Sequence, residues 1–169
     1  MTPSDSLYDT TFRSIMITDP PVLSPTMTVA VAVASLLQYR LLSMPVVDAT
    51  RHYLGQFSKK HLIACLLPAI ATQSDPQHQM ERMIEAGLLQ DTLDEVCERY
   101  AAVANNPVCD HLDKTHIVLR PEQPLVNALF FLYSGHNLLP VVEPNSHVLA
   151  GVVSTWDVLA RITNPHSPI

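Results

Sequence analysis

Glycine is scarce in this chain, with four residues among 169. A phosphate-cradling loop of the kind that nucleotide-hydrolysing enzymes use needs several glycines close together, and no such loop is present. The sequence also shows no nucleophile with a neighbouring base and no complete set of metal ligands. We therefore expect no enzymatic activity and no required cofactor.

Basic residues are also few, because ten Lys and Arg stand against sixteen Asp and Glu, for a formal net charge of -6. Nucleic-acid binding needs Lys and Arg clustered on one face, and no cluster is visible. The longest apolar runs, at 29–37 and 62–67, are shorter than the roughly 18 residues needed to cross a bilayer. The N-terminus shows no secretory signal. The sequence therefore favours a cytoplasmic protein with no nucleic-acid or membrane partner.

Cysteine occurs three times, at Cys65, Cys97 and Cys109. An odd number without paired spacing fits reduced thiols inside a cell, and each is expected to be a small buried side chain. Cys109 and His111, with Asp110 and Asp113 beside them, suggest a metal cluster. Structural zinc usually takes four Cys or His ligands in two spaced pairs, and a second pair is missing. The sequence therefore predicts neither a disulfide nor a metal site.

A seven-residue pattern occurs twice: residues 151–157 read Gly-Val-Val-Ser-Thr-Trp-Asp, and residues 55–61 read Gly-Gln-Phe-Ser-Lys-Lys-His. In each, a short strand stops at a Ser on which a helix can begin, so free backbone N–H groups point outward and attract anions. Asp157 adds a carboxylate that can accept hydrogen bonds from two hydroxyls of a ribose. Ser154 and Asp157 equally suit a helix capping box that binds nothing. Both interpretations stay open.

The elements around this pattern recur at a spacing of 95 or 96 residues. Apolar runs, Pro positions and turn residues predict an edge strand, a helix, two hairpin strands and a helix in each unit. In the first unit these are expected within 15–25 and at 29–39, 44–48, 53–57 and 58–67. In the second they are expected at 117–121, 125–134, 139–143, 148–153 and 155–162.

About 40 residues between the units belong to neither. One helical face is predicted from Met80, Met83, Ile84 and Leu88, and another from Leu93, Val96, Cys97, Tyr100 and Ala101. Thr92 and Glu95 form a plausible capping box before the second. These two amphipathic helices either pack on the chain's own core or form a surface for a second copy or a partner.

The doubled pattern resembles tandem CBS domains, the pair often called a Bateman module. The resemblance rests on strands that end in Pro25 or Pro121, on Met44-Pro-Val-Val-Asp and Leu139-Pro-Val-Val-Glu, and on the two seven-residue patterns. It implies a mixed α/β (α+β) fold in which two β-α-β-β-α repeats pack as a pseudo-twofold pair with two equivalent clefts. The expected divisions are a flexible tail 1–13, repeats 14–68 and 109–163, a helical insertion 69–108 and a C-terminal tail 164–169.

Clefts of this family bind adenosine compounds such as AMP, ATP or S-adenosylmethionine, and binding regulates an attached or partner protein. By resemblance, Ser154 faces phosphate or ribose, Asp157 holds the ribose diol, and Asn137 lies in the loop before Pro140. The remaining residues expected at this cleft are Thr18, Pro20, Leu41, Leu42, Ser43, Val152 and Trp156. Because none of them is Lys or Arg, AMP is expected to bind more tightly than ATP.

The other cleft departs from the family pattern. His61 stands where the ribose carboxylate belongs, and a neutral imidazole offers one acceptor to a diol that needs two. Ser58, Lys59 and Lys60 could still hold an anion there, with Thr115 and His116 on the far side. A degenerate, purely structural copy is the equal alternative.

These features together predict a regulatory module standing alone, which binds an adenosine ligand and transmits binding to an unknown protein target. Such a module responds by population shift when a ligand bridges the two repeats. A homodimer is expected. The alternative function is a structural dimerisation module or scaffold whose ligand sites have decayed.

Overall fold

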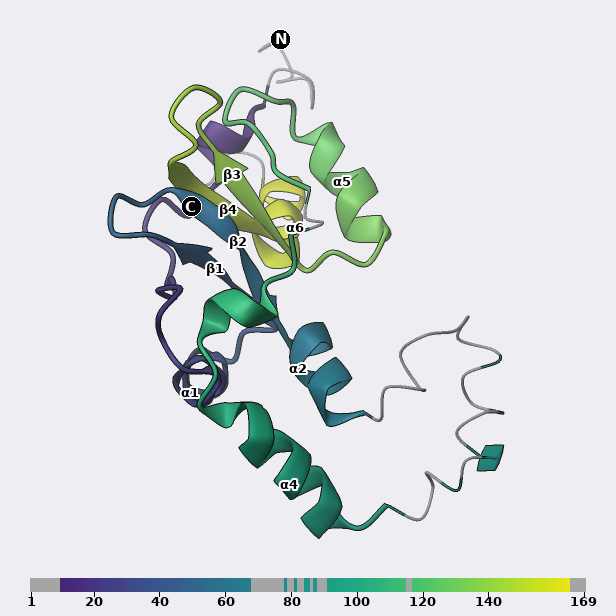
Figure 1. The fold of residues 1–169 in the computed structure, drawn as a ribbon. Helices are drawn as coiled ribbons and strands as arrows, with labels where there is room; N and C mark the ends of the chain where they lie inside the picture. Colours follow the sequence, from purple (N-terminus) through teal and green to yellow (C-terminus); the bar gives the residue numbers. More distant parts are fainter. Residues whose placement is uncertain are drawn as a thin grey trace, which may run out of the picture.

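Two similar units make up most of the protein (Figure 1). The computed structural model describes residues 10–67, 91–114 and 117–164, together with His78, Glu81, Ile84, Glu85 and Gly87. The first unit contains α1 (Val29–Tyr39), β1 (Ser43–Val47), β2 (Tyr53–Ser58) and α2 (Lys59–Leu66). The second contains α5 (Val126–Tyr133), β3 (Leu138–Val142), β4 (Leu149–Ser154) and α6 (Thr155–Thr163). The predicted helix, hairpin and helix of each unit are therefore confirmed.

The strand expected at the start of each unit is reduced to a single bridge. Leu23 pairs with Val46 of β1, and Leu119 pairs with Val141 of β3, both in parallel. Prolines flank these positions, and Pro has no backbone N–H with which to extend a ladder. Each hairpin therefore gains only one rung, and the two named sheets remain β1–β2 and β3–β4.

The segment before each unit crosses to the hairpin of the other unit. Ile17 and Val152 exchange two backbone hydrogen bonds, of 2.9 and 3.0 Å, and Asp113 exchanges two with Gln56, of 2.9 and 3.3 Å. The apolar cores follow this crossing, because Phe12 packs in the core of the second unit and Val108 in the core of the first. The two units are thus tied together by backbone at equivalent positions.

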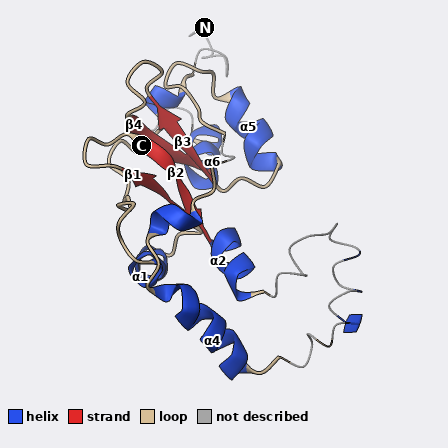
Figure 2. Ribbon diagram, in the orientation of Figure 1, coloured by secondary structure: helices blue, strands red, loops and turns tan. Residues whose placement is uncertain are grey.

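The tips of the two hairpins meet beside these crossings. Tyr53 N donates to His147 O at 2.9 Å, and Leu149 N donates to Arg51 O at 3.0 Å. Arg51 and His147 both have positive φ, of 65 and 55 degrees, and lie 96 residues apart. This reciprocal pair of bonds marks the pseudo-twofold relation between the units. The strands lie in the centre, with helices at both ends (Figure 2).

The helices α1 and α5 end in the same way. The N–H of Leu41 reaches back to Leu36 O across Arg40, and the N–H of His136 reaches back to Phe131 O across Gly135. Arg40 and Gly135 adopt left-handed conformations, with φ of 53 and 92 degrees. This ending satisfies the last carbonyls of each helix and turns the chain towards the following strand.

The N-terminal tail is shorter than expected. The described residues begin at Thr10, whose carbonyl accepts from Leu125 N at 2.8 Å, and Phe12 in the 3₁₀ turn Phe12–Ser14 is fully buried. Residues 1–9 and 165–169 of the two predicted tails lie outside the described residues. The first described residues therefore pack into the core of the second unit.

The second insertion helix is present as α4 (Leu93–Ala104), with its capping box of Thr92 and Glu95 as predicted. It contacts α2 and α1 (Figure 1), and Arg99 Nε donates to Leu66 O at 2.6 Å, yet none of its side chains is fully buried. Of the first predicted helix face, only Ile84 lies among the described residues.

The expected burial of the cysteines is wrong for two of the three. Cys97 on α4 and Cys109 in the 3₁₀ turn η4 (Val108–His111) are exposed, and Cys65 on α2 is half-buried. Both exposed cysteines lie in or beside the insertion, where little core is available.

Within the described part of the chain, no helix is long and apolar enough to cross a membrane.

Candidate functional site

Two cavities open where β1 and β3 lie against each other. The Ser154 cavity has a volume of about 330 Å³, and its lining residues are Arg40, Leu41, Leu42, Ser43, Asn137, Leu138, Ser154, Thr155 and Trp156. The Ser58 cavity has a volume of about 530 Å³. Its lining residues are Leu42, Ser43, Gln56, Ser58, Lys59, Lys60, Asp113, Ser134, Gly135, His136, Asn137 and Leu138.

The two linings correspond at the spacing of the repeat. The stretch 40–43 of one cavity matches 135–138 of the other, and Ser154 to Trp156 match Ser58 to Lys60. Leu42, Ser43, Asn137 and Leu138 line both cavities and so form a wall between them. Across this wall Gln56 Nε2 donates to Leu138 O at 3.2 Å. The structure therefore has two equivalent clefts, each built from both units.

Ser154 begins α6 with a complete capping box. Asp157 Oδ2 accepts from Ser154 N at 2.7 Å and from Ser154 Oγ at 2.6 Å, while Ser154 Oγ accepts from Asp157 N at 3.3 Å. The capping interpretation of these two residues is thus part of the observed geometry. The same bonds fix the Ser154 hydroxyl at the edge of the cavity, with the helix N-terminus behind it, where an anion is favoured.

The remaining lining of the Ser154 cavity combines apolar, aromatic and uncharged polar side chains with one cation. Trp156 is 78% exposed, and its indole is available to stack on a flat ring. Leu41 and Leu42 add apolar surface, and the Arg40 guanidinium stands at the rim. The expectation that this cleft lacks Lys and Arg is therefore wrong. Arg40 lies there because the left-handed end of α1 turns it back beside β1.

The structure brings together six of the residues predicted for this cleft, namely Leu41, Leu42, Ser43, Asn137, Ser154 and Trp156. The other four do not line the cavity. Val152 is buried and pairs with Ile17, Thr18 follows that pair as an exposed residue, and Pro20 is buried. Asp157 is half-buried behind Ser154, in the first turn of α6. The roles predicted for these four remain predictions.

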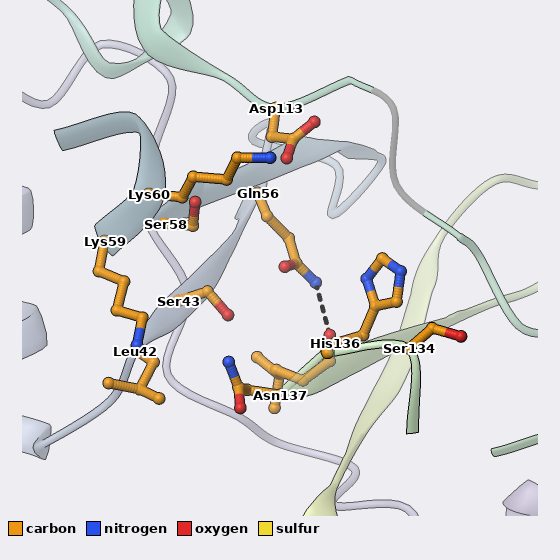
Figure 3. A pocket seen from close by; sticks show the side chains of 12 residues that line it. Leu42, Ser43, Gln56, Ser58, Lys59, Lys60, Asp113, Ser134, His136 and Asn137 are labelled. Carbon is orange, nitrogen blue, oxygen red and sulfur yellow. Dashed lines mark hydrogen bonds between the residues drawn. The ribbon is translucent and has the colours of Figure 1, made fainter. Parts of the chain in front are cut away.

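The Ser58 cavity carries more charge (Figure 3). Lys59 and Lys60 from α2 reach its rim, and Asp113, whose side chain is 14% exposed, lies on the side towards which Lys60 points. His61 does not line the cavity, and Thr115 and His116 lie outside the described residues. Of the residues predicted for this cleft, Ser58 lines it together with both lysines.

Ser58, His61 and Asp113 lie close together without forming a catalytic relay. Ser58 Oγ is 3.1 Å from His61 Nδ1, and Asp113 Oδ2 is 3.8 Å from the same nitrogen. A relay needs the nucleophile and the carboxylate on opposite ring nitrogens. Among the described residues, no group of three or more His, Cys, Asp or Glu is placed to hold a metal ion.

Several lining residues are missing from the sequence-based prediction, namely Arg40, Gln56, Asp113, Ser134, Gly135, His136, Leu138 and Thr155. Most of them could have been predicted by shifting the residues expected at one cleft by the spacing of the repeat. Leu41, Leu42 and Ser43, shifted by 95 residues, give His136, Asn137 and Leu138 of the other cavity. Gln56 stands at the position of Val152 in the other repeat. Asp113 has no such signal, because only the long-range crossing brings it to the cleft.

Comparison with known proteins agrees with this geometry. A model of the CBS domain matches the chain twice, over residues 12–68 and 104–164. The crystal structure of CBSX2 in complex with AMP has 18% sequence identity and a TM-score of 0.65, covering 93% of this chain and 98% of that chain. CBSX2 from Arabidopsis thaliana, a CBS-pair protein, has 20% identity and a TM-score of 0.67, covering 90% and 94%.

A CBS domain-containing protein of unknown function from Bacillus anthracis also has this fold. It has 14% identity and a TM-score of 0.70, covering 98% of this chain and 100% of that chain. At such identities the likeness establishes the fold alone. A comparison with curated proteins finds no match.

Proposed function

Because the chain belongs to the CBS-domain family and carries the domain twice, we propose that it is a regulatory module that binds an adenosine compound in the Ser154 cavity. The observation that carries this proposal is the lining itself. An exposed indole, two leucines, a helix-capping Ser and one guanidinium come from both units to a single cavity. The AMP bound to CBSX2, which shares the fold, supports the ligand class.

The base and the phosphate of AMP each have a matching group in this cavity. The adenine ring stacks on Trp156 and packs on Leu41 and Leu42. The phosphate meets the N-terminus of α6 and the Arg40 guanidinium, which suits a bidentate contact. One guanidinium matches one phosphate, so AMP is expected to bind this cavity more tightly than ATP.

Asp157 is proposed to accept hydrogen bonds from the ribose diol. Its Oδ2 already holds two groups of Ser154, and a carboxylate has about four acceptor positions in all. Capping and ribose binding therefore do not exclude each other. In this proposal the carboxylate that positions Ser154 also accepts the hydroxyl groups of the sugar.

Binding is transmitted because the cavity wall comes from both units. A ligand that contacts both Leu42, which precedes β1, and Ser154 of β4 stabilises the relative arrangement of the two units that fits it best. A partner protein that binds this arrangement preferentially then responds to the ligand. The second candidate function is a structural module with degenerate sites. It is favoured by one observation, the complete capping box, which accounts for Ser154 and Asp157 without a ligand.

Trp156 allows a direct test, because it is the only Trp in the chain and lines the cavity. Titration with AMP should change its fluorescence in a saturable manner, since a stacked purine alters the environment of the indole. Guanosine monophosphate and uridine monophosphate serve as ligands with another base. A spectrum that stays unchanged up to millimolar AMP would remove the proposed function and leave the structural alternative.

A further inference from the structure

The two cavities occupy equivalent positions but carry different chemistry. Where the Ser154 cavity has Thr155 and Trp156, the Ser58 cavity has Lys59 and Lys60. Where the first has Leu41, the second has His136. The surfaces on which an adenine ring stacks are thus replaced by cations and polar groups, so the second cavity is unsuited to recognise a base by stacking.

The two lysines stand at the rim without ion-pair partners among the residues described. Both belong to the first turn of α2 and are exposed. In Figure 3 the Lys60 amine points towards Asp113, but no ion pair joins them. Two ammonium groups carried by consecutive residues at the mouth of a cavity attract an anion with more than one negative charge.

The N-terminus of α2 has neither a side-chain cap nor an acidic residue in its first turn, unlike the N-terminus of α6. The Ser58 hydroxyl accepts no hydrogen bond from a backbone N–H of the first turn, and its Oγ lies 3.1 Å from His61 Nδ1 instead. In α6 the corresponding positions form a capping box with a carboxylate. Because His61 replaces that carboxylate and no acid lies in the first turn, the positive end of the α2 dipole is left for a ligand.

Buried polar groups point into the same cavity. Ser43 is only 8% exposed, its hydroxyl faces the cavity in Figure 3, and it makes no hydrogen bond to any described residue. Gln56 is 2% exposed and anchored through Nε2 to Leu138 O, which directs its amide oxygen towards the cavity. The Ser43 hydroxyl is therefore open to the cavity, where a ligand or water can form a hydrogen bond with it.

We propose that the Ser58 cavity is a second ligand site, which binds a diphosphate or triphosphate group through Lys59, Lys60 and the N-terminus of α2, and which needs no adenine ring. Asp113 is the one acid among the described lining residues. The two lysines outnumber this one carboxylate, so the described lining keeps a net positive charge. Asp113 lies on the Lys60 side of the cavity, away from Lys59 (Figure 3). This site is independent of adenosine binding in the Ser154 cavity.

The experiment is a calorimetric titration of the full chain with inorganic tripolyphosphate at low salt. Saturable binding is expected, and Lys59→Gln and Lys60→Gln should each weaken it about tenfold or more, because each removes a charged contact to phosphate. Lys114→Gln is the matched control. Lys114 is exposed and does not line the cavity, so the same loss of net charge should leave binding within about twofold of the wild type.

A titration with ATP shows whether the site recognises a triphosphate group alone or needs the attached nucleoside. If ATP and tripolyphosphate compete and both lose affinity in the Lys59→Gln variant, the phosphate chain is the recognised group. Binding of ATP but not of tripolyphosphate would overturn the proposal, as would equal losses in Lys114→Gln and Lys59→Gln. Uncharged adenosine, followed through Trp156, tests the proposed function separately, because its binding should be unchanged in both lysine variants.

Discussion

Gly151 of β4 lies directly against the carbonyl of Ile17, so close that a Cβ on Gly151 would stand 2.5 Å from that oxygen. The equivalent Gly55 of β2 stands in the same relation to Asp113, with 3.0 Å between its virtual Cβ and the Asp113 oxygen. The glycine that opens each seven-residue pattern therefore exists because the other unit's leading segment crosses over it.

Gly151→Ala should destabilise the protein by about 3 kcal/mol or more, because a methyl group would meet backbone that cannot move aside. Urea unfolding measures the change. Gly135→Ala is the matched control: nothing lies within 4 Å of its virtual Cβ, and only its φ of 92 degrees is unfavourable. It should cost about 1 to 2 kcal/mol. Equal costs for the two variants would contradict the close approach.

Asp48 in the hairpin turn should make stability depend on acid pH. The Thr50 hydroxyl, then the backbone N–H groups of His52 and Thr50, hold the pKa of its carboxyl down from 3.8 to about 2. Because the folded pKa is the lower one, the stabilisation is complete above pH 3.8 and is lost as pH falls towards 2. Thr50→Val should raise the pKa of Asp48, as measured by carboxyl NMR titration. An unchanged pKa in that variant would show that the hydroxyl plays no part.

A homodimer is expected, because equivalent helices expose large apolar side chains. Leu37 on α1 is 73% exposed, and Phe130 and Tyr133 on α5 are 67% and 92% exposed. A stable interface buries about 1,600 Å² in total. Light scattering and native mass spectrometry should give twice the chain mass, and Phe130→Glu should shift it towards the monomer. A monomer mass for the wild type at micromolar concentrations would remove this expectation.

The fold could be predicted where the determinants are local. The Thr92–Glu95 box caps α4 as expected, because capping depends on residues three positions apart. Thr28 caps α1 over the same spacing. The crossing of Ile17 to β4 was not predictable in the same way. Nothing in the sequence near Ile17 specifies a partner 135 residues later, and the prolines at 20 and 21 point only to an irregular segment.

The candidate site follows the same division. Ser154, Trp156 and the 41–43 stretch could be placed at one cleft from the repeated pattern, which the family resemblance orients. Arg40 was missed because its place depends on a left-handed helix end that usually belongs to Gly, as it does at Gly135. The chemical difference between the two cavities was visible only in part, as His61 for Asp157, since Asp113 is brought in by the crossing.

The most direct measurement is a calorimetric titration of AMP into the wild type and Asp157→Ala, with thermal unfolding beside it. The variant loses the cap, worth about 1 kcal/mol of stability, and also its hydrogen bonds to the ribose, each worth about 1.5 to 3 kcal/mol. We expect a ten- to hundredfold loss of affinity or more, on the order of 1.4 kcal/mol per factor of ten. His61→Ala, at the equivalent position of the other unit, should change AMP affinity only slightly.

Asp157→Asn separates capping from ligand binding in the same titration, because its amide oxygen can still accept from Ser154 N but offers a diol no second acceptor oxygen. Stability close to the wild type together with the low AMP affinity of Asp157→Ala is the expected result. Equal AMP affinity for the wild type, Asp157→Ala and Asp157→Asn would contradict it, and would mean that Asp157 caps α6 and takes no part in holding a nucleotide.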